Sequence, residues 1–81
     1  MEIIEDFRQI DYFQACEMIG KAWHFTATCT LFPQFDVKAR VVGIKVHHTG
    51  EMLIDTVRAS GKHLTIGSRM TGLRAVRIQS S

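Results

Sequence analysis

The chain has 81 residues, of which 46% are apolar and 22% charged, with one proline and six glycines. This composition excludes disordered and collagen-like chains, which are poorer in apolar residues or richer in glycine and proline. A chain of this length can bury one modest hydrophobic core, so we expect a single domain over residues 1–81.

Charge is distributed unevenly along the chain. Residues 1–17 carry one arginine and five carboxylates, a net charge of −4, whereas residues 18–81 carry nine Lys and Arg and three carboxylates, a net charge of +6. An acidic leader on a basic body can steer a charged partner, or the two parts can attract each other. The acidic N-terminus and the lack of ~20 consecutive apolar residues argue against a secretory signal and a membrane span, so we expect a cytoplasmic protein without a membrane partner.

Residues 11–22 predict one helix, preceded by an acidic leader at residues 1–10 for which the sequence leaves a helical turn and an extended arm open. Asp11 is suited to the N-cap, and Gln14 stands where the reciprocal half of a capping box belongs. Gly20 marks fraying or the helix end. The apolar residues with helical spacing predict one buried stripe: Tyr12, Ala15, Cys16, Ile19 and Ala22.

From residue 23 the apolar period changes from 3.6 to 2, which predicts strands. The first carries its core face on Trp23, Phe25, Ala27, Cys29 and Leu31. The second, Val37 to His47, changes its apolar face beside Gly43, which indicates a bulge or sharp bend. Further strands are expected at residues 52–59, 63–67 and 73–78, with a tight or helical turn over 68–72. We therefore expect a mainly β (α+β) fold, in which an N-terminal helix precedes a five-stranded Sm-like or SH3-like small barrel over residues 23–78.

Two cysteines, Cys16 and Cys29, lie thirteen positions apart without a CxxC pair. This spacing predicts neither a zinc knuckle nor a redox motif. Two buried free thiols are the preferred interpretation, and a disulfide is the alternative.

The stretch DYFQAC before a threonine-rich alternating strand, and GEMLIDTVRASGKHLTI before a short closing strand, resemble the Rho-specific inhibitors of transcription termination, the Rof-like proteins. The similarity extends over roughly residues 11–78. It implies a small cytosolic protein with one N-terminal helix on an Sm-like barrel, which binds the termination factor Rho and obstructs its RNA site. Because the similarity lies in pattern and order more than in identities, no binding residue is transferred.

The sequence contains no recognisable motif for catalysis, a metal ion or a cofactor. His47 and His48 are adjacent, so on a strand they would point to opposite faces and could not bind one metal ion together, whereas in a turn they could do so weakly. Ser60 and Ser68 lie beside glycines in expected turns, with no His and acid placed to activate them. The glycine segments lack the GxxxxGK[ST] spacing of a phosphate loop. We therefore expect a non-enzymatic protein with no catalytic residue, metal or cofactor.

The basic body is the best indication of function. Lys38 and Arg40 share the polar face of the second strand, whereas Arg74 and Arg77 are three apart and point to opposite faces of an ideal strand. The candidate binding residues are Lys38, Arg40, Lys45, Arg58, Lys62, Arg69, Arg74 and Arg77.

Two functions fit this pattern. One is an adaptor or inhibitor that binds an unidentified, nucleic-acid-associated protein, for example in transcription regulation. The alternative is direct binding of single-stranded RNA or DNA by the basic strands. Unpaired barrel edges also leave a homo-oligomer open.

Overall fold

The computed structural model describes residues 2–28 and 35–79. The strands form one antiparallel sheet in the order β1-β6-β2-β3-β4-β5, and the helices are short, so the chain is mainly β as the sequence predicts. The elements in chain order are β1 (Ile3–Ile4), the 3-10 helix η1 (Phe7–Gln9), α1 (Tyr12–Cys16), β2 (Ala22–Thr26), β3 (Asp36–Val46), β4 (Met52–Arg58), β5 (His63–Gly67) and β6 (Arg74–Arg77). No helix among the described residues is long and apolar enough to cross a membrane.

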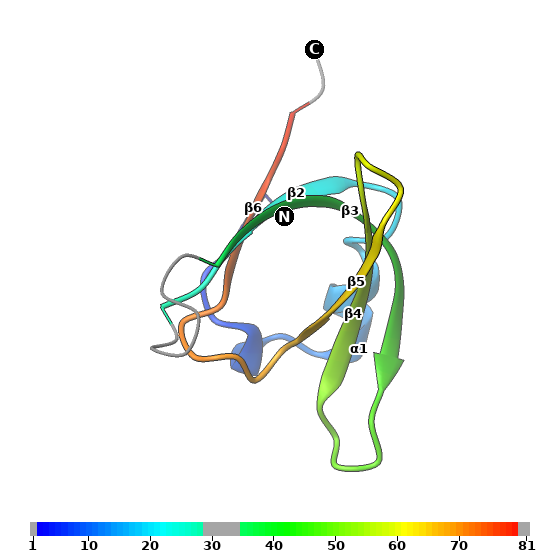
Figure 1. The fold of residues 1–81 in the computed structure, drawn as a ribbon. Helices are drawn as coiled ribbons and strands as arrows, with labels where there is room; N and C mark the ends of the chain where they lie inside the picture. The colour runs from blue at the N-terminus through cyan, green and yellow to red at the C-terminus, as the bar shows by residue number, and fades with distance from the viewer. Residues whose placement is uncertain (1, 29–34, 80–81) are drawn as a thin grey trace.

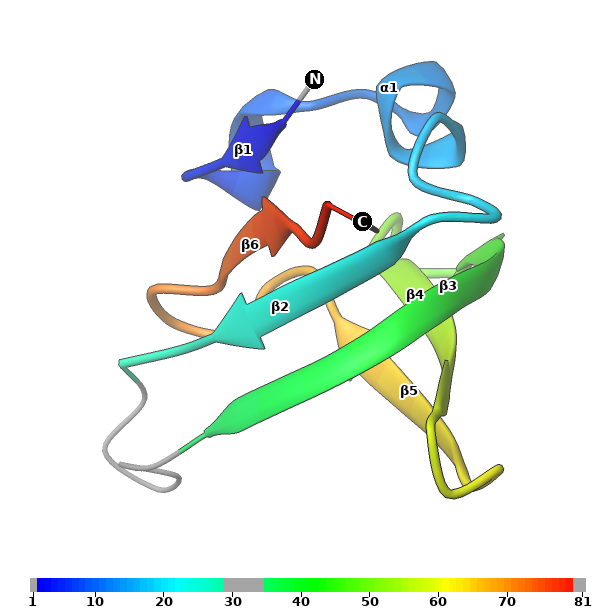
Figure 2. The same cartoon turned by 90° about the horizontal axis from the view of Figure 1, so that it is seen from above.

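The sheet is strongly curved. In Figure 1, β2 and β3 arch between β6 on one side and β4 and β5 on the other, and Figure 2 shows β4 and β5 crossing beneath β3. The pairing register of β3 against β4 shifts between Val41 and Gly43, as in a β-bulge, which bends a strand and increases its twist. The bend that the change of apolar face beside Gly43 predicts is therefore confirmed.

Closure of the sheet into a five-stranded barrel was predicted wrongly. Within the described residues, β1 and β5 are the edge strands, and no ladder joins them. The leader adds a sixth strand, because Ile3 and Ile4 pair with β6. The connection from β5 to β6 runs across the open side beside η1 (Figure 1), and Ile4 and Phe7 are buried in the core there.

The helix α1 ends earlier than the predicted residue 22. After Cys16 the chain turns toward β3, where the amide of Gly20 donates to the carbonyl of Val41 at 2.8 Å. This non-local pairing outcompetes continuation of the helix, and Ile19, predicted on the buried stripe, is exposed. Tyr12, the first residue of that stripe, is exposed as well.

The predicted capping box is present at the start of α1. The Asp11 carboxylate accepts from the Gln14 amide at 2.8 Å, and the Gln14 side-chain carbonyl accepts from the Asp11 amide at 2.9 Å. We expect Asp11→Ala to lower the free energy of unfolding by about 1 kcal/mol. The Gln14 amide loses its carboxylate acceptor, and the reciprocal hydrogen bond from the amide of residue 11 to the Gln14 side chain is weakened. Urea unfolding measures this loss, with the exposed Glu17→Ala as a control outside the capping box. Equal stability of Asp11→Ala and the native chain would contradict the prediction.

The hydrophobic core lies on the concave face of the sheet. Trp23, Phe25 and Ala27 are buried as their alternation predicts, and the indole of Trp23 donates to the carbonyl of Met18 at 3.2 Å. The rest of the core cluster is Ile4, Phe7, Ala15, Met18, Val41, Ile44, Ile54, Ile66, Leu73 and Ala75.

Cys16 is half-buried against this core. Cys29 and Leu31, predicted on the core face of the first strand, lie outside the described residues. The choice between two thiols and a disulfide therefore stays a prediction.

The segment from residue 68 to 72 forms turns rather than a helical turn. The Ser68 amide donates to the carbonyl of Met52 at 2.9 Å, and the Ser68 hydroxyl accepts from the Met52 amide at 3.2 Å. Beyond the turns, Leu73 and Ala75 are buried while Arg74 is exposed, which confirms the predicted phase of the last strand.

Candidate binding groove on the outer face of the sheet

A groove of about 350 Å³ lies on the outer, convex side of the sheet, bordered by β2, β3, the end of β4 and the residue after β6. Three cationic side chains, those of Lys38, Arg40 and Arg58, line it. The other lining residues are small or aliphatic: Ala22, Ala39, Val57, Ala59 and Ile78. We call this feature the basic groove.

The pairing register explains why these residues meet. Arg40 lies opposite Ala22 of β2 and opposite Val57 of β4. The amide of Ile78 donates to the carbonyl of Ala22 at 2.9 Å, which places Ile78 next to the row of residues Ala22, Arg40 and Val57 that runs across the three strands. Because successive side chains of a strand alternate between faces, Lys38 and Arg40 point outward while the intervening residues of β3 are buried.

The cations of the basic groove are not neutralised by carboxylates. No ion pair involves Lys38, Arg40 or Arg58 within residues 2–28 and 35–79, and no acidic residue lines the groove. The Arg40 guanidinium donates to the carbonyl of Gly20 at 2.9 Å, which fixes its orientation at the rim. A carboxylate or phosphate at the groove therefore meets positive charge without displacing an internal ion pair.

Lys62 extends this cationic region. It lies in the turn after β4, where its carbonyl accepts from the Arg58 amide at 2.9 Å. Four of the eight predicted binding residues, Lys38, Arg40, Arg58 and Lys62, therefore occupy one end of the sheet.

Two predicted residues lie elsewhere and bind the chain itself. Lys45 pairs with Asp55 at 3.4 Å on the far half of β3. Arg69 lies in the turn after β5. Its guanidinium donates to the carbonyl of Thr49 at 3.0 Å, and the backbone amide of Arg69 donates to the Glu51 carboxylate at 3.3 Å. Neither side chain lines the basic groove.

The remaining two, Arg74 and Arg77, are engaged by the acidic leader. Glu5 lies 3.7 Å from the Arg74 guanidinium, and Glu2 lies 3.3 Å from that of Arg77. Of the two roles that the charge division left open for the leader, attraction to the basic body is therefore confirmed. The two arginines do project to opposite faces, since Arg74 pairs with Thr26 and Arg77 with the buried Trp23.

Sequence reasoning missed the aliphatic half of the groove. A weak signal existed in Val57, which shares the outward phase of its strand with Asp55, and in Ile78, which follows Arg77 at the end of the last strand. Neither residue could be assigned to a groove without the ladder register that sets them beside Arg40.

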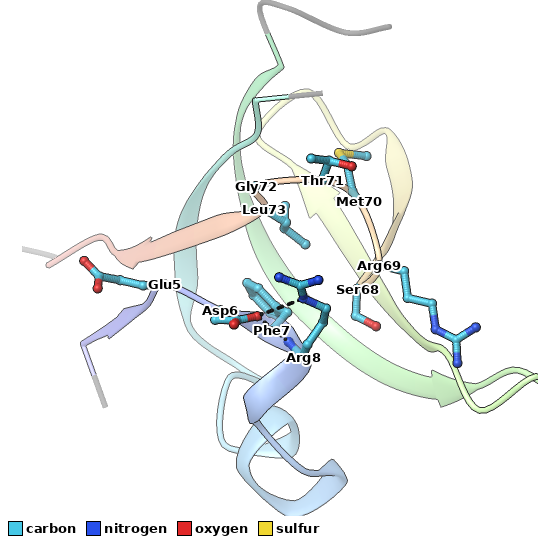
Figure 3. A pocket seen from close by; sticks show the side chains of 10 residues that line it. All are labelled: Glu5, Asp6, Phe7, Arg8, Ser68, Arg69, Met70, Thr71, Gly72 and Leu73. Carbon is cyan, nitrogen blue, oxygen red and sulfur yellow. Dashed lines mark hydrogen bonds and ion pairs between the residues drawn. The ribbon is translucent and has the colours of Figure 1, made fainter. Parts of the chain in front are cut away.

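A second hollow, of about 220 Å³, lies between η1 and the connection from β5 to β6 (Figure 3). Phe7 and Leu73 are buried beside it, and Asp6 binds Arg8 across the dashed contact. Figure 3 shows Glu5 and Arg69 pointing toward opposite sides, away from the hollow. Its polar groups do not converge, so we assign it a structural role where the leader crosses the open side of the sheet.

Asp6 caps η1. The Arg8 amide donates to the Asp6 carboxylate at 2.9 Å, and this hydrogen bond holds the pKa of Asp6 below its ordinary value of 3.8. The ionised carboxylate therefore stabilises the fold fully above about pH 4, and this stabilisation is lost as the pH falls through the lowered pKa.

We expect the native chain to lose stability relative to Asp6→Asn as the pH is lowered below about 4, because the amide keeps an oxygen acceptor but does not titrate. Urea unfolding over a pH series measures the difference between the two. Glu17→Gln, which removes an exposed carboxylate outside the cap, is the matched control. Parallel pH profiles of the native chain and Asp6→Asn would contradict the assignment.

The histidines form no metal-binding group in the described part of the chain. The rings of His47 and His48 lie in the turn after β3 with centroids 3.9 Å apart and planes tilted by 41°, and His47 contacts the Thr49 hydroxyl at 3.0 Å. His24 pairs with Asp36 across β2 and β3.

Exposed aromatic residues lie on α1, away from the groove lining. Phe13 is 80% exposed and meets the ring of Tyr12 edge to face. A hydrogen bond with the Cys16 thiol raises the pKa of Tyr12. No aromatic side chain of the described residues lines the basic groove.

The basic groove combines cations and aliphatic surface with no carboxylate in its lining, whereas Glu5 and Asp6 line the hollow beside η1. Ligand sites commonly join an apolar lining to a few placed polar groups, so we take the basic groove as the candidate functional site. Comparisons of the chain with protein-family models, with curated proteins and with solved structures found no match.

Proposed function

We propose that the protein is a non-enzymatic binding module, an adaptor or inhibitor that occupies the surface of a nucleic-acid-associated protein through the basic groove. The observation that carries this proposal is the convergence of Lys38, Arg40 and Arg58 on one aliphatic groove without carboxylate partners in the described chain. Such a surface suits a partner that brings both negative charge and apolar side chains.

We also propose that the curved sheet is an incompletely closed Sm-like small barrel. The order of one helix followed by the core strands, and the bend of β3 at Gly43, support it. The resemblance of residues 11–78 to the Rho-specific inhibitors of termination supports the same fold and a partner that works on nucleic acid. In that reading the partner meets the basic groove rather than the acidic leader, since Glu2 and Glu5 are held by Arg77 and Arg74.

A protein partner is favoured over a bare single strand by the chemistry of the groove lining. Proteins that bind single-stranded nucleic acid combine cations with aromatic side chains on which bases stack. The groove offers cations, but its other lining residues are alanine, valine and isoleucine.

Affinity capture from a nuclease-treated cell lysate tests the proposal. We expect the native protein to retain a specific protein, and the double variant Lys38→Gln, Arg58→Gln to lose it. The control is the double variant Lys45→Gln, Arg8→Gln, which also removes two positive charges, but from residues outside the groove lining. Retention of nothing specific by the native protein, or equal retention by both double variants, would overturn the proposed function.

Direct binding of single-stranded RNA or DNA is the second candidate. Lys62 favours it, because it continues the cations of the groove into the adjacent turn. Neutralisation of phosphates releases counterions, so such binding is tight at low salt and weakens steeply as salt is added. Titration of labelled single strands at low and moderate salt measures this, and no binding at low salt would exclude the candidate.

A further inference from the structure

We infer that the basic groove binds an extended acidic stretch of its protein partner, with one aliphatic side chain of that stretch against Val57 and Ile78 and flanking carboxylates at Lys38 and Arg58. The inference rests on the proposed function, that the module binds a protein through this groove. It adds the chemical class of the bound segment.

The size of the groove sets the size of the bound segment. Its volume of about 350 Å³ is near the lower end of ligand pockets. A groove of this size accommodates one or two side chains of an extended peptide, but not the face of a helix or a sheet. The recognition element is therefore a short stretch of chain.

The positive charge of the groove requires a negatively charged bound segment. Lys38 and Arg58 are exposed, and Arg40 is held at the rim by its hydrogen bond to Gly20. Three cations in one small groove repel one another in the free protein, since no acidic residue of the lining offsets them. Carboxylates that approach the rim relieve this repulsion and form charge-assisted hydrogen bonds.

The floor of the groove requires an apolar component. Val57 and Ala22 are half-buried, and Ile78 and Ala59 are exposed to solvent in the free protein. Covering these aliphatic groups with another aliphatic side chain removes apolar surface from water, which a phosphate backbone cannot do. Acidic residues around one aliphatic residue therefore match both halves of the groove.

The leader of the same chain shows this kind of recognition at a neighbouring site. Its segment Glu2–Glu5 has two carboxylates around two isoleucines. Glu2 and Glu5 bind Arg77 and Arg74, while Ile4 is buried in the core. An acidic, aliphatic, extended segment is thus complementary to arginines on this sheet.

Fluorescence anisotropy at moderate salt tests the inference with three labelled probes. The first is a peptide with one leucine between glutamates, the second replaces that leucine with serine, and the third is a single-stranded oligouridylate of equal charge. We expect the leucine peptide to bind the native protein at least about fivefold more tightly than either other probe, which corresponds to about 1 kcal/mol.

Three protein variants locate the binding. Ile78→Ser and Arg58→Gln are each expected to lower the affinity for the leucine peptide at least about fivefold, while Lys45→Gln leaves this affinity unchanged. Ile78 follows the last strand and bonds through its backbone, so its replacement leaves the sheet pairing in place, which circular dichroism checks.

Each other outcome overturns the inference. Equal affinity for the leucine and serine peptides would show binding by charge alone. Tighter binding of the oligouridylate would show that the groove binds phosphates. Failure of both peptides to bind would exclude an acidic peptide segment as its ligand. If the lysate capture depends on Lys38 and Arg58 while both peptides fail, this inference falls and the proposed function stands.

Discussion

Trp23→Ala is expected to lower the free energy of unfolding by about 3–5 kcal/mol. Trp23 is 1% exposed and is the largest fully buried side chain among the described residues. Its removal leaves a cavity in the middle of the core and also leaves the carbonyl of Met18 without the indole donor. Small domains have only about 5–15 kcal/mol of stability, so the variant is expected to lie near the threshold of folding.

Urea unfolding followed by far-UV circular dichroism measures this effect without relying on tryptophan fluorescence. Trp23→Phe is the informative companion, because it keeps most of the ring volume and removes the hydrogen bond to Met18. We expect the phenylalanine variant to retain more stability than the alanine variant. A loss below about 1 kcal/mol in Trp23→Ala would show that the residue is not at the centre of the core.

Gly72→Ala is expected to destabilise the protein by about 2–5 kcal/mol, from a strained backbone and from crowding. Gly72 has φ +68°, a conformation that residues with a side chain rarely adopt. An added Cβ would overlap the hydroxyl of Thr28 and stand 3.1 Å from its backbone nitrogen. The Thr28 amide donates to the carbonyl of Thr71 at 3.2 Å, so the change pushes apart two segments that this bond joins.

Gly61→Ala separates the two causes. Gly61 has φ +86°, but a Cβ there meets no atom within 4 Å. It should therefore show the backbone cost alone, about 1–2 kcal/mol. Thermal or urea unfolding of the two variants gives the difference, and equal losses would contradict the close approach of Thr28 to Gly72.

Strands with local alternation were predictable from the sequence. The buried phase of β2, the bend of β3 and the phase of β6 all follow from side chains within a few residues of one another. The end of α1 was not predictable in this way. It depends on the Gly20 amide, which donates to the Val41 carbonyl, and on the Lys21 carbonyl, which accepts from the Val41 amide some twenty positions along the chain. β1 depends likewise on β6, more than seventy positions away.

In the candidate site, too, the features set by neighbouring residues were predictable, and those set by long-range pairing were not. The shared outward face of Lys38 and Arg40 follows from alternation within one strand. That Arg58 joins them depends on the register between β3 and β4. The engagement of Arg74 and Arg77 by the leader required the pairing of the two chain ends, which charge counts suggested but could not assign to residues.

Amide chemical-shift mapping of the ¹⁵N-labelled protein, with the captured partner added, tests most directly whether the basic groove is the binding face. We predict shifts centred on Lys38, Arg40, Val57, Arg58 and Ile78, the residues that line the groove. Shifts confined to α1 around Phe13, or to the turn that carries His47 and His48, with the groove unchanged, would contradict the assignment.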